Sequence, residues 1–196
     1  SDLLAVMAGS DRFMPHIHLS LQSGSDPVLA RMNRGYDRAT FLAAVDRARG
    51  VLDRPAFTTD VIVGFPGETD ADFEATLEVC RHAAFSRIHV FPFSVRPGTA
   101  AAAMPDPVPV PVLRERARRL RRTADALRDR AHRKFLGDTA EVLCETRNAA
   151  EGVWDGYTER YIPVRFAGPA EWSGRVVRVR LDALDGGRVR AAAVDA

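Results

Sequence analysis

Three short segments rich in glycine, serine and proline follow predicted strands in the first half of the chain. QSGS begins at Gln22, GFPGE spans Gly64 to Glu68, and SVRPGT ends at Thr99. Glycine and proline stop a strand and expose backbone N–H and C=O groups at a turn. Ligands of parallel α/β folds bind at the carboxyl ends of the strands. The three segments together predict a ligand pocket, although a single segment of this kind more often simply ends a strand.

Other chemistry-bearing residues fit structural roles. Cys80 lies on the apolar face of a predicted helix, and Cys144 alternates with Val142 in a predicted strand, so both are expected in cores. His16 and His18 share one strand face without a third ligand nearby, which favours structure over a metal site. No serine-histidine-aspartate order, metal-binding helix motif or phosphate loop supports hydrolysis or nucleotide cleavage. We therefore assign no catalytic residue and no metal ligand in this chain.

Strands and helices alternate over the first 100 or so residues. Strands are predicted at HIHLSL from His16, at Asp60 to Val63 and at RIHVFPFS from Arg87. Helices are predicted after Asp26-Pro27, near Asp37 to Arg49, and from Thr69, where Asp72 completes a capping box with aspartate in place of glutamate. Repeats of this length indicate parallel strands with right-handed crossovers, which is an α/β architecture.

The second half of the chain changes character. An alanine- and proline-rich connection over residues 100–111 precedes a basic helix at about 112–135, which carries a local excess of seven positive charges. That helix face is equally consistent with solvation and with phosphate contacts. From Gly137 the pattern becomes short strands, AEVLCE, YIPVRF, RVVRVRL and RVRAAAV, separated by glycine-bearing turns. We predict two domains, residues 1–136 and a small β-barrel or sandwich over 137–196.

Arginines alternate with apolar residues in the last two of these strands. Arg178 and Arg180 point to one side of their strand, and Arg188 and Arg190 repeat the pattern on the next strand. Four arginines on one face predict contacts with an RNA backbone. The aromatic residues of this domain are candidates for base stacking, with core packing favoured for most: Trp154, Tyr157, Tyr161 and Phe166.

Composition limits the class of protein. The chain has 196 residues, of which 46% are hydrophobic and 28% charged, with a formal net charge of +2. These values are typical of a soluble globular protein. No apolar run approaches the length of a membrane-spanning helix, and the first residues resemble the inside of a helix rather than a signal peptide. Two distant cysteines favour a reducing, cytoplasmic location.

Three long segments resemble successive blocks of the radical S-adenosylmethionine methylthiotransferases. They are HIHLSLQSGSDPVLARMNRGY, TTDVIVGFPGETDADF and HVFPFSVRPGTAAAAMPDPVP. The final domain resembles the TRAM module, an RNA-binding β-barrel of these enzymes. The RPGT loop resembles the tRNA-modifying members. HLSLQSG and HVFPFS are most similar to the branch that methylthiolates threonylcarbamoyladenosine next to the anticodon. The isopentenyladenosine branch and a non-catalytic RNA-binding protein with a degenerate barrel are the alternatives.

The resemblance implies a fold, a cofactor and partners. The fold is the C-terminal part of a partial TIM-type radical S-adenosylmethionine barrel, followed by a small all-β TRAM barrel. The implied cofactors are S-adenosylmethionine and two four-iron four-sulfur clusters, and the implied partners are tRNA and a reductant protein. The implied cofactor-binding residues are Gln22, Ser23, Gly24, Thr59, Asp60, Gly64, Phe65, Pro66, Gly67 and Glu68. Gln22 and Ser23 would face the ribose or methionine part, and the Gly64 to Glu68 turn would hold the adenine through its backbone.

One element of the family pattern has no counterpart in these residues. The radical cluster of the family is held by three cysteine thiolates in a C-x-x-x-C-x-x-C arrangement, and this sequence has only two cysteines, far apart. The chain resembles roughly the C-terminal half of such an enzyme. We expect this polypeptide alone to bind no cluster and to have no methylthiotransferase activity. The sequence assigns no oligomeric state, and the exposed edge of a half-barrel offers a surface for association.

Overall fold

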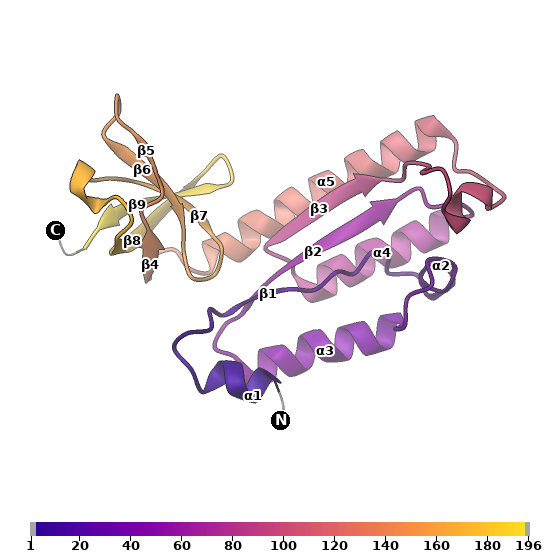
Figure 1. The fold of residues 1–196 in the computed structure, drawn as a ribbon, viewed down its shortest axis with the longest axis horizontal. Coiled ribbons are helices and arrows are strands. Elements are labelled where there is room, and N and C mark those ends of the chain that lie inside the picture. Colours follow the sequence, from indigo (N-terminus) through magenta and orange to yellow (C-terminus); the bar gives the residue numbers. More distant parts are fainter. Residues whose placement is uncertain (1–2, 195–196) are drawn as a thin grey trace. The chain divides into compact units, whose positions relative to one another are not determined.

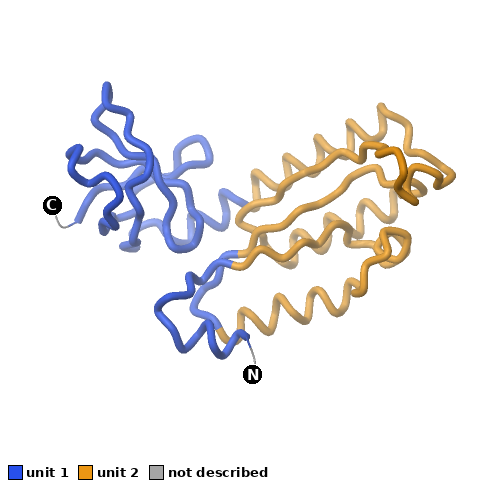
Figure 2. The backbone as a smooth tube through the Cα atoms, viewed as in Figure 1, with its two compact units in different colours: residues 1–16, 52–56, 128–196 blue, residues 17–51, 57–127 orange. Residues whose placement is uncertain are grey.

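A computed structural model describes residues 3–194, which divide into two compact units (Figures 1 and 2). Unit 1 combines Arg128–Ala196 with Ser1–His16 and Leu52–Ala56, and unit 2 combines Ile17–Val51 with Phe57–Leu127. The sequence places a domain boundary after residue 136, whereas the two units part within the long basic helix, before Arg128.

Helices and strands alternate in the first 133 residues, as the sequence predicts. In chain order they are α1 (Leu3–Ala8), β1 (His16–His18), α2 (Asp26–Arg31), α3 (Arg38–Val51), β2 (Ala56–Val63), α4 (Asp70–Ala83), β3 (Arg87–Pro92), η1 (Ala100–Ala103) and α5 (Val110–Arg133). The sequence predicts only four residues for the strand that becomes β2, which in fact begins at Ala56. The early part of β2 is buried on both faces and therefore shows no alternation to read.

A three-stranded sheet in the order β1-β2-β3 organises this α/β region. β2 and β3 run parallel in a register from Thr58 opposite Arg87 to Val63 opposite Pro92. A parallel bridge between Gln22 and Val61 extends the pairing beyond β1. The carboxyl ends of these strands therefore lie at one edge of the sheet, which is the edge where the glycine-rich segments begin.

Helix α4 begins where the capping box predicts. The Thr69 hydroxyl accepts a hydrogen bond from the Asp72 N–H at 3.2 Å, and the Asp72 carboxylate accepts one from the Thr69 N–H at 2.9 Å. Two of the N–H groups that a helix start leaves without backbone partners are thereby satisfied. The buried face of α4 includes Phe73, Leu77 and Cys80, so the predicted core role of Cys80 is confirmed.

The second half of the chain forms a six-stranded sheet in the order β4-β8-β9-β7-β6-β5. Its strands are β4 (Thr139–Leu143), β5 (Thr146–Asn148), β6 (Val153–Tyr157), β7 (Pro163–Ala167), β8 (Val176–Asp185) and β9 (Arg188–Ala193), with the turn η2 (Ala170–Trp172) before β8. The sequence does not predict β5 or β6, because β5 has three residues and Gly156 interrupts the apolar alternation of β6.

The six-stranded sheet curls until its edge strand β4 reaches the end of β6. An antiparallel bridge joins Val142 to Thr158, and a Cβ atom at Gly156 would lie 2.7 Å from the Leu143 carbonyl oxygen. Glycine is required there because only a residue without a side chain permits this approach of two strands. The enclosed core is lined by Trp154, Phe166 and ten further buried residues, and Cys144 is among them, as predicted.

His132 lies near the end of α5 and is buried within unit 1, with 2% of its surface exposed. Its Nδ1 has no hydrogen-bond partner among the described residues. Burial lowers the pKa of His132 to about 4, with the positive charge of Arg128 acting in the same direction. The negative charge of Asp129 and a backbone hydrogen bond with Gly187 oppose this shift. The ring is therefore neutral in the folded protein at neutral pH.

We predict that unit 1 loses stability as the pH falls from about 6.5 towards 4. The unfolded chain binds a proton on His132 at about pH 6.5, whereas the folded chain resists it down to about 4. The stabilisation is complete above pH 6.5 and declines by up to roughly 3 kcal/mol across this window. Both tryptophans lie in unit 1, so urea denaturation followed by tryptophan fluorescence measures the change.

The matched control is the exposed His82. His132→Gln should flatten the pH dependence of the tryptophan transition between pH 6.5 and 4, whereas His82→Gln should leave it unchanged. An equal slope in the two variants would contradict the assignment to His132.

Candidate functional site

A pocket of about 360 Å³ lies in unit 2, at the carboxyl ends of β2 and β3. Its lining combines an amide, a carboxylate, a guanidinium and hydroxyl groups with apolar and aromatic side chains. The lining residues are Gln22, Asp60, Ile62, Phe91, Pro92, Phe93, Ser94, Arg96, Thr99 and Ala101. A concave, largely apolar surface with a few polar groups is the usual form of a small-molecule site.

Gln22 reaches this pocket from a strained backbone. Its φ angle is +62°, in the left-handed region that residues other than glycine rarely adopt. Two hydrogen bonds hold it: the Gln22 N–H donates to the Asp60 carbonyl at 2.8 Å, and the Gln22 carbonyl accepts from the Ile62 N–H at 2.9 Å. Strain of this kind persists where surrounding structure imposes it, and such residues concentrate at ligand sites.

Asp60 supplies the carboxylate of the pocket from the middle of β2. Its side chain is 30% exposed, and its Oδ2 lies 3.3 Å from the His18 Nε2. His18 is itself positioned by Thr58, whose hydroxyl lies 3.1 Å from the ring Nδ1. His18 thus has a structural partner on each ring nitrogen, and the carboxylate retains exposed surface for a cationic or hydroxyl-bearing ligand.

Arg96 enters from the RPGT turn that follows β3. The Thr99 hydroxyl donates a hydrogen bond to the Arg96 carbonyl at 2.8 Å, and Gly98 has a φ of +82°. The turn therefore folds back on itself and places Arg96 and Thr99 on the same pocket. Together with Asp60 and Gln22, these residues give the pocket one acidic and one basic group.

Three backbone N–H groups of the GFPGE turn are occupied by hydrogen bonds within the protein. The Gly64 N–H donates to the Glu68 carboxylate at 2.7 Å, the Gly67 N–H donates to the Asp106 carbonyl at 2.8 Å, and the Glu68 N–H donates to the Phe65 carbonyl at 2.9 Å. The turn touches the pocket lining through an edge-on contact of the Phe65 and Phe93 rings, whose centroids are 5.3 Å apart. It therefore supports the wall of the pocket.

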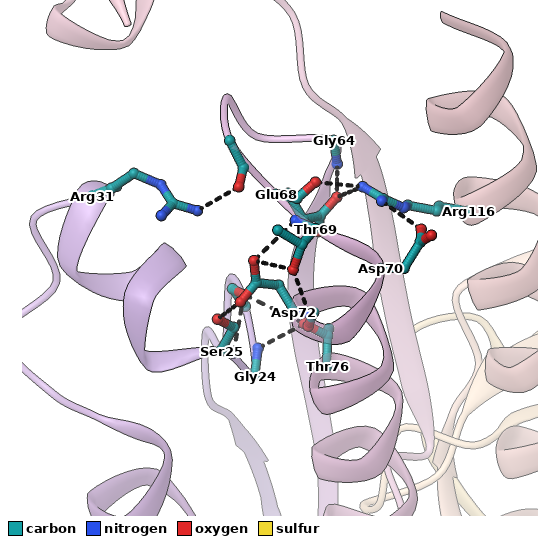
Figure 3. A network of polar contacts seen from close by, with 12 residues as sticks. Gly24, Ser25, Arg31, Gly64, Glu68, Thr69, Asp70, Asp72, Thr76 and Arg116 are labelled. Carbon is teal, nitrogen blue, oxygen red and sulfur yellow. Dashed lines mark hydrogen bonds and ion pairs between the residues drawn. The ribbon is translucent and has the colours of Figure 1, made fainter. Parts of the chain in front are cut away.

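A buried ion pair ties this turn to α5 (Figure 3). The Arg116 guanidinium donates to the Glu68 carboxylate at 2.9 Å and to the Glu68 carbonyl at 3.0 Å, and it reaches the Asp70 carboxylate at 2.7 Å. The side chains of Glu68 and Arg116 are only 1% and 7% exposed. Burial raises the pKa of Glu68, while the Gly64 N–H and Arg116 oppose that rise by stabilising the charged form.

The structure places two of the ten residues that the resemblance implies, Gln22 and Asp60, in the pocket lining. Ser23 and Gly24 instead contact α4, where the Gly24 N–H donates to the Thr76 hydroxyl at 2.9 Å and the Ser23 and Thr76 hydroxyls lie 3.3 Å apart. Thr59 binds the Leu19 carbonyl. Gly64, Phe65, Pro66, Gly67 and Glu68 lie in the supporting turn, outside the lining.

Sequence reasoning missed most of the lining after β3. It names SVRPGT as one of three strand ends but assigns none of its residues to the site, although Ser94, Arg96 and Thr99 all line the pocket. The signal that would have found them is an arginine in a proline-glycine turn that closely follows two phenylalanines, Phe91 at the end of β3 and Phe93 just after it.

The two cysteines have no features of metal ligands. Cys80 and Cys144 are fully buried, and burial raises the pKa of the Cys80 thiol to about 12. Within residues 3–194, no group of three or more histidine, cysteine, aspartate or glutamate side chains is arranged to hold a metal ion.

The predicted RNA-binding arginines fall into two places on the six-stranded sheet. Arg178 and Arg180 are exposed on β8, opposite Glu141 and Thr139 of β4. Arg188 and Arg190 lie on β9 and line a second pocket. Of the four aromatic residues, Trp154 and Phe166 are core residues, whereas Tyr157 and Tyr161 are 39% and 41% exposed.

Comparison with known proteins relates the chain to a family. The Radical SAM superfamily matches residues 2–80. The chain is 41% identical, over 179 residues, to the threonylcarbamoyladenosine tRNA methylthiotransferase MtaB of Thermotoga maritima. It is 42% identical, again over 179 residues, to the tRNA-2-methylthio-N(6)-dimethylallyladenosine synthase of Mycobacteroides abscessus. These matches cover 91% of this chain but 41% and 34% of the two relatives.

The chain therefore belongs to the radical S-adenosylmethionine methylthiotransferase family. The α/β fold that the sequence predicts is confirmed by this membership and by the parallel sheet. The chain spans about two fifths or less of the length of these relatives. Among the residues that the structure describes, no helix combines the length and hydropathy needed to cross a membrane.

The family implies S-adenosylmethionine and iron–sulfur clusters, and the residues present fit only the first of these. Asp60 suits the amino group or the ribose hydroxyls, Arg96 suits the carboxylate, and the apolar wall with Phe91 suits the adenine ring. An iron–sulfur cluster needs several accessible thiolates, and Cys80 and Cys144 lie protonated and apart in two separate cores. These residues offer no cluster site.

We predict that Arg116→Met destabilises unit 2 by about 3 kcal/mol, because it leaves the Glu68 carboxylate buried without its partner. The comparison variant is Arg119→Met, on the same helix as Arg116, which breaks the ion pair between Arg119 of α5 and Glu74 of α4. Arg119 is 41% exposed, so its loss should cost less than about 1 kcal/mol. Urea denaturation followed by far-ultraviolet circular dichroism reports the helices of unit 2.

A double variant separates the ion pair from packing. Adding Glu68→Gln to Arg116→Met removes the unpaired charge and should recover part of the lost stability. Equal destabilisation by Arg116→Met and Arg119→Met would contradict the account.

Proposed function

We propose that this chain is part of a tRNA methylthiotransferase that modifies N6-threonylcarbamoyladenosine next to the anticodon. The observation that carries the proposal is the pocket at the ends of β2 and β3, whose acidic, basic and apolar walls match the parts of S-adenosylmethionine. Similarity to the Thermotoga maritima enzyme over 91% of the chain supports the choice of reaction. The proposed product carries a methylthio group on C2 of the modified adenine.

The chain's own residues bind and orient the cofactor in this proposal. S-adenosylmethionine supplies radical chemistry when it is bound beside a reduced cluster. Asp60 and Gln22 hold its polar parts from the β2 side, and Arg96 neutralises its carboxylate. The rings of Phe91 and Phe93 cover its base. The GFPGE turn keeps these groups in place through the Phe65 and Phe93 contact. The remaining predicted residues around Ser23 and Thr59 act through the backbone that they position.

A second substrate has its own support. The Mycobacteroides abscessus relative, which is named for dimethylallyladenosine, is as similar to this chain as the Thermotoga relative is. The two products differ in the group on N6, so mass spectrometry of tRNA nucleosides distinguishes them. A non-catalytic RNA-binding protein with a degenerate barrel is the third possibility, and it predicts no methylthiolated product.

The experiment deletes the gene that encodes this chain and analyses the tRNA nucleosides of the resulting strain. We expect the methylthio form of threonylcarbamoyladenosine to disappear and its unmodified precursor to accumulate. Loss of the methylthio form of dimethylallyladenosine instead would select the second substrate. An unchanged nucleoside profile would reject the enzyme proposal altogether.

Replacing Asp60 tests the pocket in the same strain. We predict that a gene copy with Asp60→Asn yields about one tenth or less of the methylthiolated nucleoside that the wild-type copy yields. The reason is that the proposed charge-assisted hydrogen bond between Asp60 and the cofactor is lost. Asp46→Asn is the matched control, because Asp46 is an exposed carboxylate of α3 that also pairs with a histidine, His82. Full activity of the Asp60 variant would contradict the proposal that this pocket binds the cofactor.

The proposed enzyme also requires iron–sulfur clusters and a reductant protein, which these 196 residues do not supply. We propose that the active enzyme uses two four-iron four-sulfur clusters whose ligands lie outside the 196 residues. The isolated chain should then contain no stoichiometric iron or sulfide after anaerobic reconstitution and should show no turnover with a reductant. Stoichiometric iron and sulfide, or turnover, in the isolated chain would contradict the proposal that the cluster ligands lie elsewhere.

The tRNA is the proposed macromolecular partner, in the cytoplasm. We propose that the six-stranded domain serves as a TRAM barrel and contacts tRNA through the outward arginines Arg178, Arg180, Arg188 and Arg190. The burial pattern supports the assignment: Arg178, Arg180 and Arg190 are exposed and Arg188 is half-buried, while the intervening Val179, Leu181 and Val189 are buried.

A further inference from the structure

A second pocket, of about 320 Å³, opens on the outer face of the six-stranded domain. Three of its five lining residues are arginines: Arg165, Arg188 and Arg190, with Asp185 and Gly186 completing the wall. Arg165 and Arg190 are direct neighbours in the register of the parallel strands β7 and β9. Three guanidinium groups meeting at one hollow make a site for an anion with several oxygen atoms.

Asp155 holds two of these arginines in place. Its carboxylate accepts bonds from the Arg165 Nε at 2.9 Å and Nη2 at 2.8 Å, and from the Arg188 Nη1 at 2.6 Å. The hydrogen bonds from Arg165 lower the pKa of Asp155, and the positive charge of Arg188 adds to the effect. Asp155 is thus a positioning residue, and it fixes two long side chains before any ligand arrives.

Arg190 is the arginine with unused donors. Within residues 3–194, it has no ion-pair partner, and its guanidinium offers five N–H groups. Asp155 and Glu151 pair with Arg165, and Asp155 also pairs with Arg188. Arg190 thus carries the one guanidinium charge of this pocket that no carboxylate of the described residues pairs. That single charge matches the single charge of a phosphodiester.

An aromatic surface lies on the same face of the sheet. Tyr157 follows Asp155 by two residues on β6, so both side chains point outward, and Asp155 is the register partner of Arg165. The rings of Tyr157 and Tyr161 stack at 4.5 Å with an 11° tilt, and Tyr161 also stacks on His16. Exposed rings beside a phosphate site are the combination with which proteins bind single-stranded nucleic acid.

We propose that a single-stranded segment of RNA crosses the outer face of β6, β7 and β9, with a phosphodiester in the Arg165, Arg188 and Arg190 pocket and a base against Tyr157. The inference rests on the proposed tRNA partner and adds Arg165 and Tyr157 to the arginines proposed above. An acidic peptide would satisfy the arginines but would leave the tyrosine stack without a function.

The test measures the binding of the 196-residue chain to a fluorescein-labelled oligouridylate of about 12 nucleotides by fluorescence anisotropy. Arg190→Ala should weaken binding about five- to tenfold and reduce the slope of log K against log salt by about one. Arg190→Lys should retain that slope. Arg175→Ala is the matched control, because it removes an exposed arginine of the same domain that lies outside this pocket, and it should change affinity by less than about twofold.

Tyr157→Ala provides the second measurement. It should weaken oligouridylate binding about fivefold while leaving the salt slope unchanged, because stacking involves no counterion release. Unchanged tryptophan fluorescence in each variant verifies that the domain is folded. Equal losses for Arg175→Ala and Arg190→Ala, or no loss for Arg190→Ala, would overturn the proposal.

Competition experiments distinguish the possible ligands of the arginine pocket. Displacement of the RNA by equimolar inorganic phosphate or by an oligoglutamate peptide would also overturn it, by showing a free-anion or acidic-peptide site. The tRNA nucleoside analysis described above is independent of these measurements. Loss of the reaction assignment with an intact Arg190 effect would leave an RNA-binding domain, and the reverse would leave an enzyme that contacts tRNA elsewhere.

Discussion

The buried pair of Glu68 and Arg116 is the interaction on which the α/β unit depends. The Glu68 carboxylate accepts hydrogen bonds from the Gly64 N–H, just after β2, and from the Arg116 guanidinium of α5. The same guanidinium also donates to Asp70 in the first turn of α4. A strand end and two helices are thus joined at one point. Desolvation offsets much of the attraction in such a pair, so its main contribution is to specify one arrangement of the three elements.

This constraint decides which groups remain available to a ligand. The amides of the GFPGE turn are occupied by Glu68, Phe65 and Asp106, so the turn acts as a rigid support. The groups available to a ligand lie instead at the neighbouring strand ends, where Gln22 and Asp60 line the pocket. Binding sites are generally built in this way, because side chains that contact a ligand are positioned accurately only when other residues support them.

Local features of the fold were predictable from the sequence, and distant partnerships were not. The Thr69 and Asp72 capping box, the buried face of α4 and the strand ends follow from spacings of two to four residues. Arg116 lies 48 residues from Glu68, and nothing in either local pattern indicates that they meet. The same holds for Asp155, which binds arginines from two other strands. The short β5 and the glycine-interrupted β6 were missed because neither shows alternation.

The burial of both cysteines protects the folded chain from oxidation and alkylation. Oxidants and alkylating reagents attack the exposed thiolate form of cysteine. Cys80 is fully enclosed and has a pKa of about 12, and Cys144 is fully enclosed in the other core. While folded, this polypeptide therefore presents no thiol to oxygen or peroxide. Air exposure during purification should leave its covalent structure unchanged at both positions.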